Sequence, residues 1–123
     1  MNALTIVHET IKRFVRDGDV CIDATAGRGY DTAFLCELVG KNGKVIAMDI
    51  QQDAVDSTNA LLESKGLCAQ VVLDSHANMA KYAEKDSVRC IVFNLGYLPK
   101  GNHGIYTHFE STKQAVESGL ELL

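Results

Sequence analysis

Two glycines and one aspartate stand at a spacing that can bind a ribose. Gly27 and Gly29 form a G-x-G pair directly after a short apolar run. Because neither residue has a Cβ, the backbone there can come close to a ligand. Asp49 comes 20 positions after Gly29, at the end of a second apolar run. An acid at that place can hydrogen-bond ribose hydroxyls, so the spacing predicts a site for an adenosine-containing cofactor.

The residues around this loop distinguish between two such cofactors. Thr32 stands where the third glycine of a G-x-G-x-x-G motif would be, and Asp23 and Asp31 flank the loop. Their carboxylates would repel the pyrophosphate of NAD but favour the ammonium and sulfonium groups of S-adenosylmethionine (SAM). We therefore predict a SAM site. Asp31 has an alternative role as a helix N-cap, and the two roles are compatible.

Polar residues also follow two later apolar runs. Residues 74–76, with the sequence D-S-H, either contact the adenine or cap the helix that comes next. Residues 94–99, with the sequence N-L-G-Y-L-P, end the fourth run. The Asn94 carboxamide both accepts and donates hydrogen bonds, so it can orient an amine nucleophile, and Tyr97 can stack on a base. The alternative for this segment is a structural turn.

Helical and extended patterns alternate along the chain and must position these residues. We expect strands over 20–22, 45–48, 69–73 and 88–93, and helices over 4–16, from 31 or 32 to 40, over 52–65, over 77–84 and from about 110. Short apolar runs separated by helices predict a doubly wound, mostly parallel α/β sheet of the Rossmann-like type. In such sheets, ligands bind at the carboxyl ends of the strands. We expect a single domain, 1–123.

Composition narrows the class of protein. The chain is 46% hydrophobic and 23% charged, which is ordinary for a soluble domain, and it lacks a secretory signal and an apolar run of about 20 residues. The four cysteines form no C-x-x-C motif, so we expect buried thiols, a cytoplasmic setting and no metal. The net charge of −4 gives no general attraction to nucleic acid.

Three segments together resemble a known family. D-A-T-A-G-R-G-Y-D-T (23–32), A-M-D-I (47–50) and N-L-G-Y-L-P (94–99) look like the family long labelled putative rRNA methylases. Its studied members are tRNA 5-(aminomethyl)-2-thiouridine methyltransferases. The resemblance implies a class I SAM-dependent methyltransferase. It would methylate the aminomethyl nitrogen of wobble 5-aminomethyl-2-thiouridine, in the anticodon region of tRNA. Family members continue for about another third, so we expect the N-terminal portion of such a domain, with a sheet edge that promotes self-association.

The residues and the resemblance together predict three sets of functional residues. The cofactor set is Asp23, Ala24, Gly27, Gly29, Asp31, Thr32, Asp49, Ile50, Ser75, His76 and Asn94. The catalytic set is Asn94, Leu95 and Tyr97, and the RNA-binding set is Tyr97, Pro99, Lys100, His103 and His108. The alternatives are an rRNA or small-molecule amine methyltransferase, a dehydrogenase nucleotide domain that the acidic loop disfavours, and a non-catalytic SAM-binding fragment.

Overall fold

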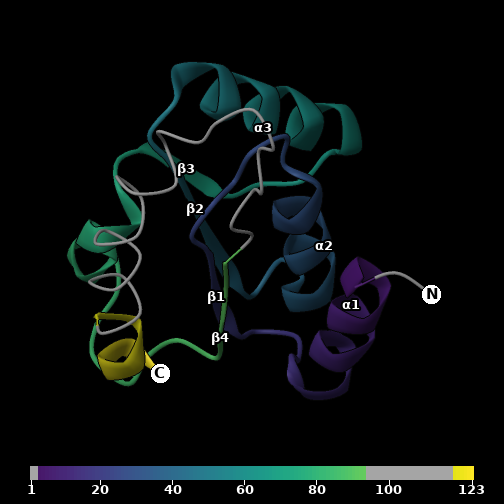
Figure 1. Cartoon of the computed structure of the whole chain (residues 1–123). Helices are drawn as coiled ribbons and strands as arrows, with labels where there is room; N and C mark the ends of the chain where they lie inside the picture. The colour runs from purple at the N-terminus through teal and green to yellow at the C-terminus, as the bar shows by residue number, and fades with distance from the viewer. Residues whose placement is uncertain (1–2, 94–117) are drawn as a thin grey trace.

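The computed structural model describes residues 3–93 and 118–123 and contains a parallel four-stranded sheet (Figure 1). The strands lie in the order β3-β2-β1-β4. Their bounds are β1 Val20–Asp23, β2 Lys44–Asp49, β3 Gln70–Leu73 and β4 Cys90–Val92. The predicted strands are confirmed, although β4 is shorter than the predicted run over 88–93.

Helices connect these strands at the predicted places, with two differences. The helices between and before the strands are α1 Ala3–Phe14, α2 Tyr30–Val39, α3 Gln52–Lys65 and the 3₁₀ helix η1 His76–Lys81. The α-helix predicted over 77–84 is therefore a shorter 3₁₀ helix. Residues 118–122 are also helical, within the helix predicted from about 110. Asp31 is not an N-cap, because Gly29 takes a left-handed conformation (φ 91°) and turns the chain into α2 before Asp31. Asp31 instead lies in the first helical turn, where a negative charge is favourable.

The order of the strands creates a switch point beside β1. The chain proceeds from β1 outward to β2 and β3 and then returns to place β4 on the other side of β1. In register, Cys21 lies between Val45 of β2 and Cys90 of β4. In such a sheet the crevice at the carboxyl ends of β1 and β4 is the expected ligand site.

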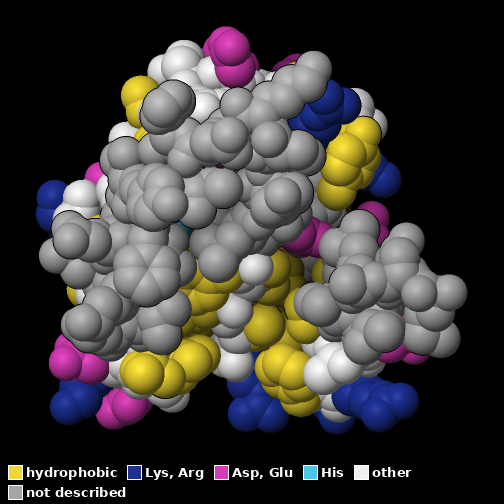
Figure 2. Space-filling model, viewed as in Figure 1, with side chains coloured by type: hydrophobic (Ala, Val, Ile, Leu, Met, Phe, Trp, Pro, Cys, Tyr) yellow, Lys and Arg dark blue, Asp and Glu magenta, His cyan; other side chains and the backbone are white. Residues whose placement is uncertain are grey.

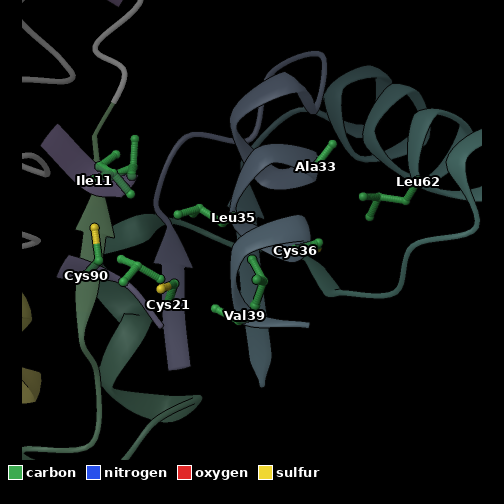
Figure 3. Packing of buried hydrophobic residues seen from close by; sticks show 11 residues of the cluster. Ile11, Cys21, Ala33, Leu35, Cys36, Val39, Leu62 and Cys90 are labelled. Carbon is green, nitrogen blue, oxygen red and sulfur yellow. The ribbon is translucent and has the colours of Figure 1, made fainter. Parts of the chain in front are cut away.

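Each face of the sheet packs against its own hydrophobic cluster. On one face, Leu35 and Val39 of α2 point toward the sheet, where Cys21 and Cys90 lie on neighbouring strands (Figure 3). On the other face, Met79 of η1 packs in a cluster that includes residues of β1 and β2. These clusters anchor the strands whose carboxyl ends form the site.

Three of the four cysteines are buried, as predicted, but Cys68 is exposed. It lies in the short connection between α3 and β3, at the surface of the sheet's edge, and its carbonyl accepts a hydrogen bond from the thiol of Cys36. None of the described helices is long and apolar enough to cross a membrane.

Candidate functional site

The loop after β1 is folded back onto the end of β2. The Ala26 amide donates a hydrogen bond to the Met48 carbonyl at 2.8 Å, and the Gly29 amide donates to the Ala26 carbonyl at 2.8 Å. Gly27 has a positive φ of 56°, and among the described residues a Cβ built there would meet only the Thr25 carbonyl oxygen, at 3.9 Å. As far as the described residues go, the backbone at Gly27 is therefore open on the side where a side chain would stand.

Asp49 lies beside this loop, as the spacing predicts. Its Oδ2 accepts a hydrogen bond from the Gly27 amide at 3.0 Å, and its Oδ1 accepts one from the Gln51 amide at 3.0 Å. A carboxylate offers about four lone-pair positions. These two bonds leave each oxygen able to accept a further hydrogen bond, as binding of two ribose hydroxyls requires.

Packing against helix α3 also requires a glycine at position 29. A Cβ at this position would lie 2.9 Å from Cα of Thr58 and 3.2 Å from its Cγ2. The close neighbour of Gly29 is thus helix α3. Within the part of the chain that the structure describes, this helix contact and the positive φ explain the glycine.

Asp23 ends β1 and is fully buried with Thr32. Asp23 Oδ2 accepts a hydrogen bond from the Thr32 hydroxyl at 2.7 Å, and Oδ1 accepts one from the Thr25 amide at 3.2 Å. The pKa of Asp23 is raised from 3.8 to about 6, chiefly by burial. The nearby carboxylates of Asp31 and Asp49 contribute to this rise, and the two hydrogen bonds oppose it. Three acids therefore surround the loop and create a negative site.

The D-S-H segment after β3 is fixed by its own hydrogen bonds. The Tyr82 hydroxyl donates to Asp74 Oδ2 at 2.6 Å and the Asn78 amide group donates to Oδ1 at 2.8 Å, which lowers the pKa of Asp74. Ser75 Oγ accepts from the Ala77 amide at 3.2 Å, so the capping role is confirmed. This network holds the half-buried segment at the carboxyl edge.

His76 connects that segment to the end of β4. Its ring lies 5.9 Å from the ring of Phe93, with the planes inclined by 55°. Phe93 immediately precedes Asn94. The predicted catalytic and RNA-binding residues, Asn94, Leu95, Tyr97, Pro99, Lys100, His103 and His108, lie outside the described residues.

Two other predicted cofactor residues have contrasting exposure. Ala24 is buried, and its amide donates to the Val92 carbonyl at 2.8 Å, which continues the pairing of β1 with β4. Ile50 is 55% exposed directly after Asp49, and Leu73, the register partner of Asp49, is 53% exposed. Ile50 and Leu73 give the carboxyl edge an apolar surface next to a carboxylate.

An open groove of about 540 Å³ lies behind the loop, between the start of α2 and helix α3. Its lining is Arg28, Tyr30, Ser57, Ala60 and Leu61. No predicted cofactor residue belongs to this set, so the groove is distinct from the candidate cofactor site. Among residues 3–93 and 118–123, no three His, Cys, Asp or Glu side chains are grouped as metal ligands would be.

Sequence reasoning missed Thr58, Asn78 and Tyr82. Thr58 stands at the middle of the buried face of α3, between Val55 and Leu62. A polar residue in an apolar helical stripe is the signal that could have identified it, because a buried hydroxyl requires a hydrogen-bond partner. Tyr82 and Asn78 gave no comparable signal, since both are half-buried in irregular sequence.

The residues around the glycine loop fit SAM better than they fit a dinucleotide. The carboxylates of Asp23, Asp31 and Asp49 favour cationic groups. Among the described residues, the Gly27 backbone is open. Asp49 can accept hydrogen bonds from ribose hydroxyls. A pyrophosphate would meet negative charge at the same place. The geometry therefore matches a cofactor that joins an adenosine to a cationic amino acid.

Known proteins are similar to this chain in sequence and in fold. A tRNA (mnm(5)s(2)U34)-methyltransferase, chloroplastic, from Arabidopsis thaliana is 35% identical over 98% of this chain and 48% of its own length. A "putative rRNA-methylase" structure from Clostridium thermocellum is 46% identical, with a TM-score of 0.90 over all of this chain and 67% of that one. A "putative methyltransferase" from Streptococcus mutans, solved with SAH, is 33% identical, with a TM-score of 0.85 over all of this chain and 67% of its own.

These relatives confirm the predicted fold and indicate SAM as the cofactor. The chain spans about half the length of the curated relative from Arabidopsis thaliana. The profile of the family described as "Putative rRNA methylase" matches residues 45–123. The chain therefore belongs to this family of SAM-dependent methyltransferases.

Proposed function

We propose that the protein is a SAM-dependent methyltransferase that acts on tRNA and methylates the aminomethyl nitrogen of wobble 5-aminomethyl-2-thiouridine. One structural observation supports SAM as the cofactor. The Asp49 carboxylate and the open Gly27 backbone meet at the carboxyl edge of the sheet, with Asp23 and Asp31 beside them. The tRNA part is supported by the Arabidopsis thaliana relative and by the N-L-G-Y-L-P segment.

Different described residues would bind different parts of the cofactor. Asp49 would accept hydrogen bonds from the ribose hydroxyls. The exposed side chains of Ile50 and Leu73 would provide an apolar surface for the adenine. The negative charge around the loop would favour the cationic methionine end. When bound, SAM would supply a methyl group whose bond to the sulfonium sulfur breaks as the amine attacks, so that the sulfur leaves as a neutral thioether. The substrate amine would lose one proton to water before this attack. The main task left to the protein is placement of the amine.

That placement is the proposed role of residues 94–99. The Asn94 side-chain oxygen and the Leu95 carbonyl would accept hydrogen bonds from the neutral amine and aim its lone pair at the methyl group. The same oxygens would stabilise the positive charge that grows on nitrogen in the transition state. Tyr97 would hold the base by stacking. Lys100, His103 and His108 would meet phosphates.

Figure 2 shows where Lys and Arg side chains of the described residues lie on one face of the molecule. In this view, the largest group of Lys and Arg side chains lies along the lower edge, where the strands begin, whereas the cofactor site is at the opposite end of the sheet. The phosphate contacts that we propose near the methyl group rest on the sequence of the segment that follows β4.

Single-turnover methylation of tRNA that carries the aminomethyl precursor tests this function. Asn94→Ala should reduce the rate by about 10²–10³, the range for removal of one such polar group. Asn59→Ala, on the exposed side of α3, is the matched control. A wild-type rate in the Asn94 variant would remove that residue from catalysis. If the unaltered protein does not methylate this tRNA but methylates rRNA or a small amine, the substrate belongs to the alternative class.

A further inference from the structure

Thr58 is a buried polar residue that contacts the cofactor loop from behind. It lies on α3, which passes across the end of the sheet at which α2 begins (Figure 1), and it is 0% exposed. Its hydroxyl donates a hydrogen bond to the Gly27 carbonyl at 3.3 Å. Its Cα and Cγ2 occupy the space in which Gly29 would carry a Cβ. Thr58 therefore touches the loop at both glycines.

These contacts fix Gly27 at both of its backbone hydrogen-bonding groups. The Gly27 amide is held by Asp49 Oδ2 at the end of β2, and the Gly27 carbonyl is held by Thr58. Gly27 adopts a positive φ of 56°, a conformation that glycine reaches without steric cost. The two hydrogen bonds orient this peptide segment before any ligand arrives, which reduces the ordering that binding would require.

We propose that Thr58 is a positioning residue for the SAM site. Its hydroxyl fixes the Gly27 carbonyl, and its packing against Gly29 keeps α3 at the distance at which the loop is open to the cofactor. The proposal rests on the SAM site put forward above. A neutral hydrogen bond of this kind contributes about 0.5–1.5 kcal/mol, so its loss corresponds to about two- to tenfold in affinity.

A purely structural role would have different consequences. Thr58 shares the buried face of α3 with Val55 and Leu62, so a residue that only filled this face could lower the melting temperature without changing the affinity of the folded protein. A positioning residue changes the affinity by more than its effect on stability explains. The comparison must therefore measure both quantities on each variant.

The test is titration of S-adenosylhomocysteine into the protein and its variants by calorimetry, with thermal melts of each. Thr58→Val keeps the branched shape but removes the donor, and we expect its Kd to rise about three- to tenfold. Leu62→Val, one turn along the same buried face, is the control. It should lower the melting temperature with an unchanged Kd. An unaltered Kd in Thr58→Val would overturn the proposal.

A second pair of variants isolates the hydroxyl if Thr58→Val does not fold. Thr58→Ser and Thr58→Ala differ only by that group, and we expect the Ala variant to bind several-fold more weakly than the Ser variant. Equal Kd values in this pair would show that the hydroxyl does not position the loop. If the unaltered protein does not bind S-adenosylhomocysteine, the proposed SAM site itself fails and this inference falls with it.

Discussion

Replacing Asp23 by Asn should flatten part of the pH dependence of the free energy of unfolding. Asp23 is fully buried, and burial raises its pKa in the folded state to about 6 from 3.8. The folded state therefore holds this proton more strongly than the unfolded state does. The stabilisation is fully present below pH 3.8 and is lost as the pH rises through 6.

The size of this effect follows from the two pKa values. At 1.36 kcal/mol per pH unit, a rise from 3.8 to about 6 corresponds to about 3 kcal/mol in full. About 2 kcal/mol of it should be lost between pH 4 and pH 7. Asn has the same shape and does not titrate, and its side-chain oxygen can still accept the hydrogen bond from the Thr25 amide.

Urea unfolding at several pH values measures this difference. We expect the free energy of unfolding of Asp23→Asn, relative to the unaltered protein, to rise by about 2 kcal/mol between pH 4 and pH 7. Asp86→Asn, an exposed residue with a φ of 60° that Asn tolerates, is the control for loss of one charge. A constant difference between Asp23→Asn and the unaltered protein across this range would refute the assignment of a raised pKa to Asp23.

Three further substitutions test other contacts. Asp49→Ala should weaken SAM binding by about 1–3 kcal/mol, because the ribose hydroxyls lose their acceptor, and calorimetry measures the change. Gly29→Ala should lower the free energy of unfolding by at least about 2 kcal/mol in urea, since its φ is 91° and its Cβ would lie 2.9 Å from Cα of Thr58. Tyr82→Phe should raise the pKa of Asp74 toward its ordinary value, because the carboxylate loses its 2.6 Å hydrogen bond; a titration of carboxyl resonances by NMR would show it.

The element order and the position of the cofactor loop could be predicted from the sequence because they depend on local patterns. The apolar run of β2 predicts a strand, and Gly40 predicts the end of helix α2. The start of α2 could not be located in the same way. Its position depends on the left-handed turn at Gly29, where Thr58, 29 residues later in the chain, leaves no room for a Cβ.

Only part of the candidate site could be predicted from the sequence, because the rest depends on contacts between distant segments. The spacing between Gly29 and Asp49 predicts their shared edge, because parallel strands end on the same side of a sheet. It does not predict that Asp49 binds the Gly27 amide or that Asp23 is buried with Thr32. Those facts depend on how the loop folds back over β2.

The central claim is that the acidic glycine loop binds SAM and not a dinucleotide. Calorimetric titration of the protein with S-adenosylhomocysteine and, separately, with NAD tests it most directly. The account predicts saturable binding of one S-adenosylhomocysteine per chain, weakened in Asp49→Ala, and no heat from NAD. Binding of NAD without binding of S-adenosylhomocysteine would contradict it.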